Sequence, residues 1–129
     1  MTTTLTRILY VEDDADIQAV GELALAHVGG FTVELCSSGQ EALNKVADFQ
    51  PELILLDVMM PGIDGIETYQ ALKEQGHLEK TPVVFMTAKV QQEDLAHYRQ
   101  LGIADIISKP FDPMSLSDRV RKIWQQSRS

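Results

Sequence analysis

The order of apolar segments along the 129-residue chain constrains its fold more than any other feature. Short apolar runs rich in branched residues read as β-strands, and segments long enough for one helix separate them. The runs are RILYV, FTVELC, ELILL, PVVFMT and ADIIS. Strands joined by helical crossovers run parallel, and helices then cover both faces of the sheet. The sequence therefore predicts a doubly wound α/β fold with five strands and five helices.

The helices are predicted from the spacing of apolar residues and from the residues that start and stop helices. The expected ranges are roughly 14–28, from 37 or 38 to about 50, 64–75, 90–101, and a last helix that begins near Pro113. In the first helix, the spacing of Ile17, Val20, Ala24 and Val28 predicts one buried stripe. The stripe predicted for the last helix consists of Leu116, Val120 and Ile123.

The composition and charge restrict the class of protein. A hydrophobic fraction of 44% and a charged fraction of 23% are ordinary for a globular domain. We therefore expect a single domain over 1–129, with its core at about 7–126 and no output domain in this chain. The net charge of −8 argues against non-specific binding of nucleic acid. The absence of a secretory signal and of an apolar run near the roughly 18 residues that span a bilayer favours a cytoplasmic protein without a membrane anchor.

Chemically active side chains lie at the carboxyl ends of the predicted strands. Glu12 and Asp13 follow the first strand, whereas Asp57, Thr87 and Lys109 lie at the ends of the third, fourth and fifth. Ligands of doubly wound folds bind at this edge of the sheet. The residues alone leave two interpretations of the acidic run EDD open: a solvated turn that caps the first helix, and part of a ligand site.

The acidic residues predict a cation site. If the first and third strands are neighbours, Asp57 lies near Glu12 and Asp13, and unit charges about 5 Å apart repel by roughly 3 kcal/mol at an effective dielectric constant of about 20. Oxygen ligands without histidine or cysteine favour Mg²⁺, or Mn²⁺, over zinc. Mg²⁺ commonly binds a phosphate oxygen as well, and the Lys109 ammonium and Thr87 hydroxyl suit phosphoryl oxygens. An ionised Asp57 can then act as the nucleophile that forms an acyl phosphate.

Four motifs occur in a fixed order along the chain: VEDD, LLDVMMPGIDG, MTA and SKPF. On these motifs the chain closely resembles the receiver domain of bacterial two-component response regulators, from about Arg7 to Gln126. The resemblance implies a flavodoxin-like sheet with strand order 2-1-3-4-5. It also implies a phosphorylation-dependent switch that catalyses only its own phosphorylation and slow dephosphorylation.

The resemblance assigns the acceptor and metal roles to matching residues. Asp57 accepts a phosphoryl group from the phosphohistidine of a kinase. Glu12 and Asp13 hold Mg²⁺, directly or through water, together with Asp57 and the backbone carbonyl of Met59.

The resemblance also assigns the phosphoryl contacts, which fall on Thr87, Ala88 and Lys109. Lys109 pairs with the acceptor and then with the phosphoryl group, and Thr87 moves to hydrogen-bond a phosphoryl oxygen, which shifts the fourth helix. The family's proline peptide after the lysine is typically cis, so Lys109–Pro110 is expected to be cis.

The chain departs from the family pattern at one switch position. Ile106 stands where the family usually has an aromatic residue three positions before the lysine. We therefore predict that the switch at Thr87 is coupled to the fourth helix more weakly or by a different route than in the family. By analogy Met59 and Lys89 line the site entrance, and an apolar Met59 cannot orient an attacking water, so self-dephosphorylation is expected to be slow.

Two other functions compete with the switch. One is a receiver-like interaction module that is never phosphorylated, and the other is a Mg²⁺-dependent phosphohydrolase with an aspartyl intermediate. Met59 argues against the second, because such enzymes usually carry an acid two residues past the nucleophile. The partners that fit a switch are a sensor histidine kinase or phosphotransfer protein, a downstream protein target of unknown identity, and a second copy of the chain in a homodimer.

Overall fold

A five-stranded parallel sheet forms the centre of the molecule in a computed structural model that describes residues 4–88 and 91–128. The strand order is β2-β1-β3-β4-β5, and every neighbouring pair is parallel. The strands are β1 (Arg7–Val11), β2 (Thr32–Cys36), β3 (Leu53–Asp57), β4 (Val83–Thr87) and β5 (Asp105–Ser108). The predicted doubly wound fold and the order 2-1-3-4-5 are confirmed.

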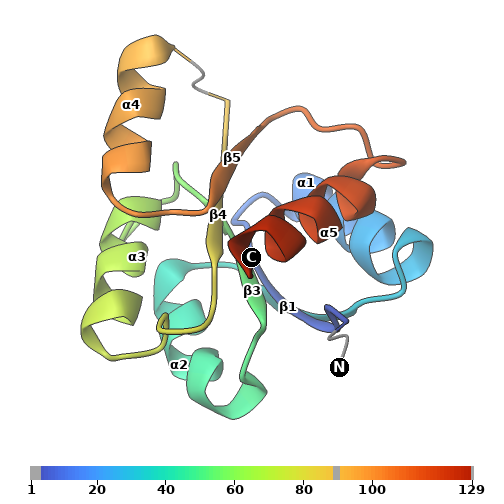
Figure 1. The fold of residues 1–129 in the computed structure, drawn as a ribbon, viewed down its shortest axis with the longest axis horizontal. Coiled ribbons are helices and arrows are strands. Elements are labelled where there is room, and N and C mark those ends of the chain that lie inside the picture. Colours follow the sequence, from blue (N-terminus) through green and yellow to red (C-terminus); the bar gives the residue numbers. More distant parts are fainter. Residues whose placement is uncertain (1–3, 89–90, 129) are drawn as a thin grey trace.

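Helices cover both faces of this sheet, with α2, α3 and α4 on one face and α1 and α5 on the other (Figure 1). They are α1 (Ala15–Glu22), continued by the π-helical segment η1 (Leu23–Val28), α2 (Gly39–Phe49), α3 (Gly65–Glu74), α4 (Gln92–Gln100) and α5 (Leu116–Ser127). Caps fix their starts: Ser38 accepts from the Glu41 amide, and Asp64 forms a capping box with Glu67. Within the described residues, no helix is long and apolar enough to cross a membrane.

The central strand β3 is buried along its whole length. Its side chains alternate between two cores. Leu53 and Leu55 pack in the core beneath α1 and α5, whereas Ile54 and Leu56 pack in the core beneath α2, α3 and α4. A strand covered on both faces reads as a continuous apolar run, and such a strand holds its last residue, Asp57, in a fixed place.

The stripe predicted for α1 is wrong in part. Val20 and Val28 are 42% and 47% exposed, and the buried positions are Gly21, Ala24 and Leu25. A Cβ on residue 21 would lie 2.4 Å from the side chain of Tyr10, so glycine lets the helix approach β1 at this point. The π-helical hydrogen bond from the Gly29 amide to the Ala24 carbonyl then changes the helical repeat. The stripe predicted for α5 is confirmed, since Leu116, Val120 and Ile123 are all buried.

Candidate functional site

Three carboxylates meet at the carboxyl edge of the sheet. Because β1 pairs with β3, with Val11 opposite Leu56, the residues that follow these two positions come together. Oxygen atoms of Glu12, Asp13 and Asp57 all lie within 4.8 Å of one another. Glu12 and Asp57 are each 1% exposed, whereas Asp13 is exposed. The predicted acidic cluster therefore exists, with one carboxylate open to solvent.

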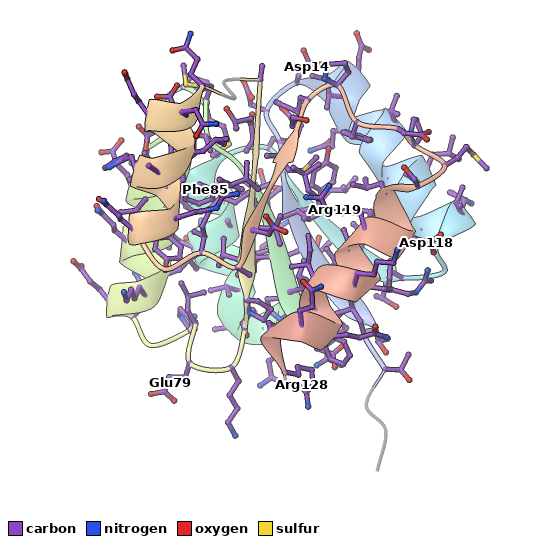
Figure 2. All side chains as sticks on the ribbon, turned by 45° about the horizontal axis from the view of Figure 1, so that its top comes forward. Asp14, Glu79, Phe85, Asp118, Arg119 and Arg128 are labelled. Atoms are coloured by element: carbon purple, nitrogen blue, oxygen red, sulfur yellow. The ribbon has the colours of Figure 1, made fainter. Side chains whose placement is uncertain are left out.

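The third acid of the EDD run serves a different purpose. Asp14 caps α1, because its Oδ1 accepts from the amides of Asp16 and Ile17 at 2.9 and 3.0 Å. Figure 2 shows Asp14 at the start of this helix, at the edge where the strands end. Its own amide donates to Glu12 Oε2 at 3.1 Å. The capping interpretation is therefore confirmed for Asp14, whereas Glu12 and Asp13 lie in the acidic cluster, where a ligand site stays a prediction.

Lys109, which follows β5, lies between the two buried carboxylates. Its Nζ is 3.0 Å from Glu12 Oε1 and 3.0 Å from Asp57 Oδ1. Burial alone would lower the pKa of Lys109, but these two hydrogen bonds outweigh burial and raise the pKa above its usual value. The ammonium therefore stays charged. The Lys109–Pro110 peptide is cis, as the resemblance implies.

The donor set of this site fits a hard cation. Three carboxylates face one ammonium, which leaves an excess of negative charge, and every acidic ligand atom is oxygen. A search of the acidic, histidine and cysteine side chains of the described residues finds one group close enough to hold a metal ion, and it is this set of three carboxylates. The histidines lie elsewhere, with His27 and His97 exposed and His77 half-buried.

Asp57 is held in an environment that opposes its charge. Burial is the main cause that raises its pKa to about 7; the Lys109 hydrogen bond partly offsets this, and the charge of Glu12 adds to it. Asp57 Oδ1 also accepts from the Met59 amide at 3.4 Å. A second positive charge at the site would therefore favour the ionised, nucleophilic form.

The raised pKa predicts a pH-dependent stability. Between about pH 4 and pH 7 the folded protein binds a proton at Asp57 that the unfolded chain lacks. The stabilisation of the folded state by this proton is therefore complete below pH 4 and is lost as the pH rises through 7. Without metal, the free energy of unfolding of the wild type is expected to fall by about 1–3 kcal/mol more over this range than that of Asp57→Asn. Urea unfolding in EDTA at several pH values measures this difference. If the free energies of unfolding of the wild type and Asp57→Asn changed in parallel with pH, burial would not raise the pKa of Asp57.

Thr87 ends β4 and is fully buried. Its carbonyl accepts from the Lys109 amide at 2.9 Å, so the ends of β4 and β5 are tied together. The neighbouring Ala88 is exposed. Tyr98 of α4 packs edge-on against Phe85 of the same strand, β4, with ring centres 5.5 Å apart.

The remaining predicted positions differ in their exposure. Met59 is 57% exposed at the rim, and Ile106 is 7% exposed in the core beneath α4. Lys89 lies outside the described residues. Tyr98, which is buried in α4, is not among the predicted residues, although its spacing of three from Leu95 places both residues on one face of the helix.

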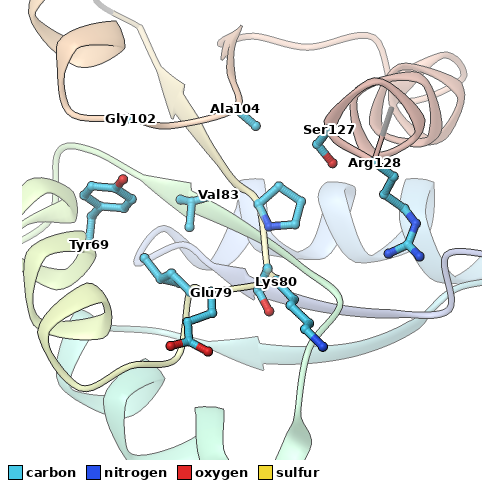
Figure 3. A pocket seen from close by; sticks show the side chains of 11 residues that line it. Tyr69, Glu79, Lys80, Val83, Gly102, Ala104, Ser127 and Arg128 are labelled. Atoms are coloured by element: carbon cyan, nitrogen blue, oxygen red, sulfur yellow. The ribbon is translucent and has the colours of Figure 1, made fainter.

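A cavity of about 520 Å³ lies away from this cluster, where the residues before β4 and β5 meet the end of α5 (Figure 3). Tyr69, Glu79, Lys80, Ala104 and Arg128 are among the residues that line it. It borders the amino ends of the strands, whereas the acidic cluster lies at their carboxyl ends. The cavity is therefore separate from the candidate site.

Known proteins with similar sequences are regulators. The chain is 38% identical over 125 residues to the transcriptional regulatory protein PcoR of Escherichia coli, covering 97% of this chain and 54% of that protein. It is 36% identical over 121 residues to the alkaline phosphatase synthesis transcriptional regulatory protein PhoP of Bacillus subtilis, covering 94% and 49%. The chain thus spans about half the length of the curated relatives it matches.

Solved structures share the fold across nearly the whole chain. The chemotaxis protein CheY4 of Vibrio cholerae superposes with a TM-score of 0.85 at 27% identity, covering 93% of this chain and 99% of that chain. The BeF3-activated DrrB receiver domain superposes with a TM-score of 0.80 at 27% identity, covering 95% and 99%. The family model of the response regulator receiver domain matches residues 8–121. With its fold, its site and these similarities in agreement, the chain belongs to the response regulator receiver domain family.

Proposed function

We propose that this chain is a phosphorylation-dependent signalling switch whose phosphoryl acceptor is Asp57. The observation that carries the proposal is the placement of the Asp57 carboxylate at the end of the central strand, 3.0 Å from Lys109 and within the acidic cluster. In the transfer, an Asp57 oxygen attacks the phosphorus of a phosphohistidine. A P–O bond forms as the P–N bond breaks, and the histidine leaves with the electron pair and takes up a proton.

The residues around Asp57 supply positioning and charge for this step. Glu12, Asp13 and Asp57, with the backbone carbonyl of Met59, are the proposed ligands of Mg²⁺, for which Mn²⁺ can substitute. When bound, the metal neutralises charge on the phosphoryl oxygens. Lys109 exchanges its contact with Asp57 for a phosphoryl oxygen, and Thr87 and Ala88 line the phosphoryl site from the end of β4.

The output of the switch is a change in protein binding. We propose a sensor histidine kinase or a phosphotransfer protein as the donor and a downstream protein as the target, in the cytoplasm, with no direct contact between this domain and nucleic acid. The chain acts in this proposal as one receiver unit over 1–129, with its core at about 7–126. Support comes from family membership and from the DrrB relative, which is described as BeF3-activated.

The proposal is tested by the intact mass of the protein after incubation with Mg²⁺ and acetyl phosphate. We expect the addition of one phosphoryl group, which EDTA and Asp57→Asn each abolish. No addition from acetyl phosphate or from a panel of phosphorylated kinases would contradict the switch and favour an interaction module that is never phosphorylated. Continuous turnover of an aryl phosphate would instead favour the phosphohydrolase.

The exposed Met59 predicts a long-lived phosphoryl group. A thioether cannot orient the water that hydrolyses an acyl phosphate, whereas an amide can. Met59→Asn is therefore expected to speed dephosphorylation about tenfold, which is less than the rate enhancement that a fully positioned general base provides. Decay of the phosphorylated mass with time measures the rate. Met114→Asn, at a methionine that is 71% exposed, serves as the matched control and should leave the rate unchanged. Equal rates in all three proteins would contradict this role of Met59.

A further inference from the structure

The three carboxylates of the acidic cluster are held in place to different degrees. Glu12 accepts from Lys109 at Oε1 and from the Asp14 amide at Oε2, at 3.0 and 3.1 Å. Asp57 accepts from Lys109 at 3.0 Å. Asp13 is exposed, and in the part of the chain that the structure describes no hydrogen bond or ion pair to its carboxylate is found. The position of the Asp13 carboxylate therefore depends on its backbone.

Gln18 of α1 holds the backbone at this point. Its Nε2 donates to the Glu12 carbonyl at 3.1 Å and to the Cys36 carbonyl at 3.3 Å. Carbonyl oxygens can only accept hydrogen bonds, so the NH₂ group of the side chain, and not its oxygen, faces both of them. The Ser37 hydroxyl lies 3.4 Å from the same nitrogen. One side chain of α1 thus links the end of β1 to the end of β2.

The Glu12 carbonyl belongs to the peptide group that joins Glu12 to Asp13. A peptide group is planar and turns as one unit, so its orientation sets the direction in which the Asp13 side chain leaves the backbone. Among the described residues, the hydrogen bond from Gln18 is the one found to this peptide group, because none is found from the Asp13 amide. The Glu12 amide, on the other side of the residue, donates to the Cys36 carbonyl at 2.9 Å. The backbone of Glu12 is therefore fixed by β2 on one side and by Gln18 on the other.

We propose that Gln18 is a positioning residue for the metal site, which holds the Glu12–Asp13 peptide and thereby keeps the Asp13 carboxylate within the acidic cluster. This inference rests on the proposed function, because it takes the acidic cluster as the site of Mg²⁺. Mg²⁺ requires near-ideal octahedral geometry, so a displaced ligand weakens its binding. Side chains that orient metal ligands typically contribute roughly 10- to 100-fold to metal affinity. Gln18 acts through the backbone and not on the carboxylate itself, so its effect should lie near the lower end, at about tenfold.

The test compares Gln18→Met, which keeps the length of the side chain and removes its donors, with Gln40→Met as a matched control. Gln40 is an exposed glutamine of α2 whose Nε2 donates to Asn44 Oδ1 at 3.2 Å. Gln18→Ala removes the same donors without adding a thioether. Binding of Mn²⁺ to each unphosphorylated 129-residue chain is measured by electron paramagnetic resonance, with Mg²⁺ as the competitor, and urea unfolding in EDTA measures the stability of each protein.

We expect the Kd for both metal ions to rise about tenfold in the two Gln18 variants and to stay unchanged in Gln40→Met. At saturating Mg²⁺, phosphorylation of the Gln18 variants by acetyl phosphate should return to nearly the wild-type rate, because the defect lies in binding the metal and not in the transfer. A merely structural role would lower the free energy of unfolding and leave the Kd unchanged. Wild-type metal affinity in the folded Gln18 variants would overturn this inference and leave the proposed function standing. Failure of the wild type to bind either ion would overturn both.

Discussion

Replacing Lys109 with methionine is expected to destabilise the metal-free protein by about 2 kcal/mol and to slow phosphorylation of Asp57 by roughly 100-fold or more. The change leaves Glu12 and Asp57 buried without a counter-charge. Breaking a fully buried pair costs about 3–5 kcal/mol, and the cost is lower here because the Lys109 side chain is 14% exposed and Asp57 can take up a proton. The rate falls because the ammonium is then missing where charge develops on the transferring group. Urea unfolding and intact-mass time courses measure the two effects.

Lys45 provides a matched control for this change. It also contacts two carboxylates, Glu34 at 3.3 Å and Glu41 at 3.1 Å, but its side chain is 39% exposed. Surface pairs contribute little, so Lys45→Met should leave both stability and phosphorylation nearly unchanged. If Lys109→Met were phosphorylated as fast as Lys45→Met, Lys109 would have no part in the transfer.

Substituting alanine for Gly65 should disturb the backbone that carries the acceptor, Asp57. A Cβ at this position would lie 2.4 Å from the Asp57 carbonyl oxygen and 2.7 Å from the Val58 Cα, and these are backbone atoms that cannot turn aside. The start of α3 must then move away from the end of β3, and its hydrogen bond from the Gly65 amide to the Val58 carbonyl must lengthen. We expect a loss of about 2–4 kcal/mol in the free energy of unfolding, as for strong overpacking. Phosphorylation of the folded fraction should also slow.

Gly76 separates this local effect from a general cost of losing a glycine. Gly76 has a φ of +81° and no atom near its missing Cβ, so Gly76→Ala meets only backbone strain, of about 1 kcal/mol. Its phosphorylation rate should equal that of the wild type. Comparable losses of stability and equal rates in the two variants would show that the close approach of Gly65 does not position Asp57.

The strands and the acidic cluster could be predicted because both follow from local patterns. β3 reads as an apolar run that ends in Asp57, and the parallel pairing of β1 with β3 brings Glu12 beside it. A charged residue at the end of a buried strand requires polar or charged partners, and these partners must lie at the same edge of the sheet. Lys109 was predictable for the same reason.

The packing of α1 and the burial of Tyr98 could not be predicted in detail, because both depend on contacts between distant segments. Gly21 looks like a helix-weakening residue until the ring of Tyr10 is seen against it. Tyr98 looks like an ordinary helix residue until the fold packs its ring edge-on against Phe85 of β4. Apolar spacing shows which face of a helix can be buried, and the shapes of the partners decide which face is buried.

The central claim is that Asp57 itself receives the phosphoryl group. The most direct test is to treat the phosphorylated protein with borohydride, which reduces an aspartyl phosphate to homoserine, and to locate the converted residue by peptide mass spectrometry. We predict conversion at Asp57, dependent on Mg²⁺ and on the phosphodonor. Conversion at Asp13 or Asp14, or a stable phosphoryl group on a hydroxyl or histidine side chain with Asp57 unmodified, would contradict the account.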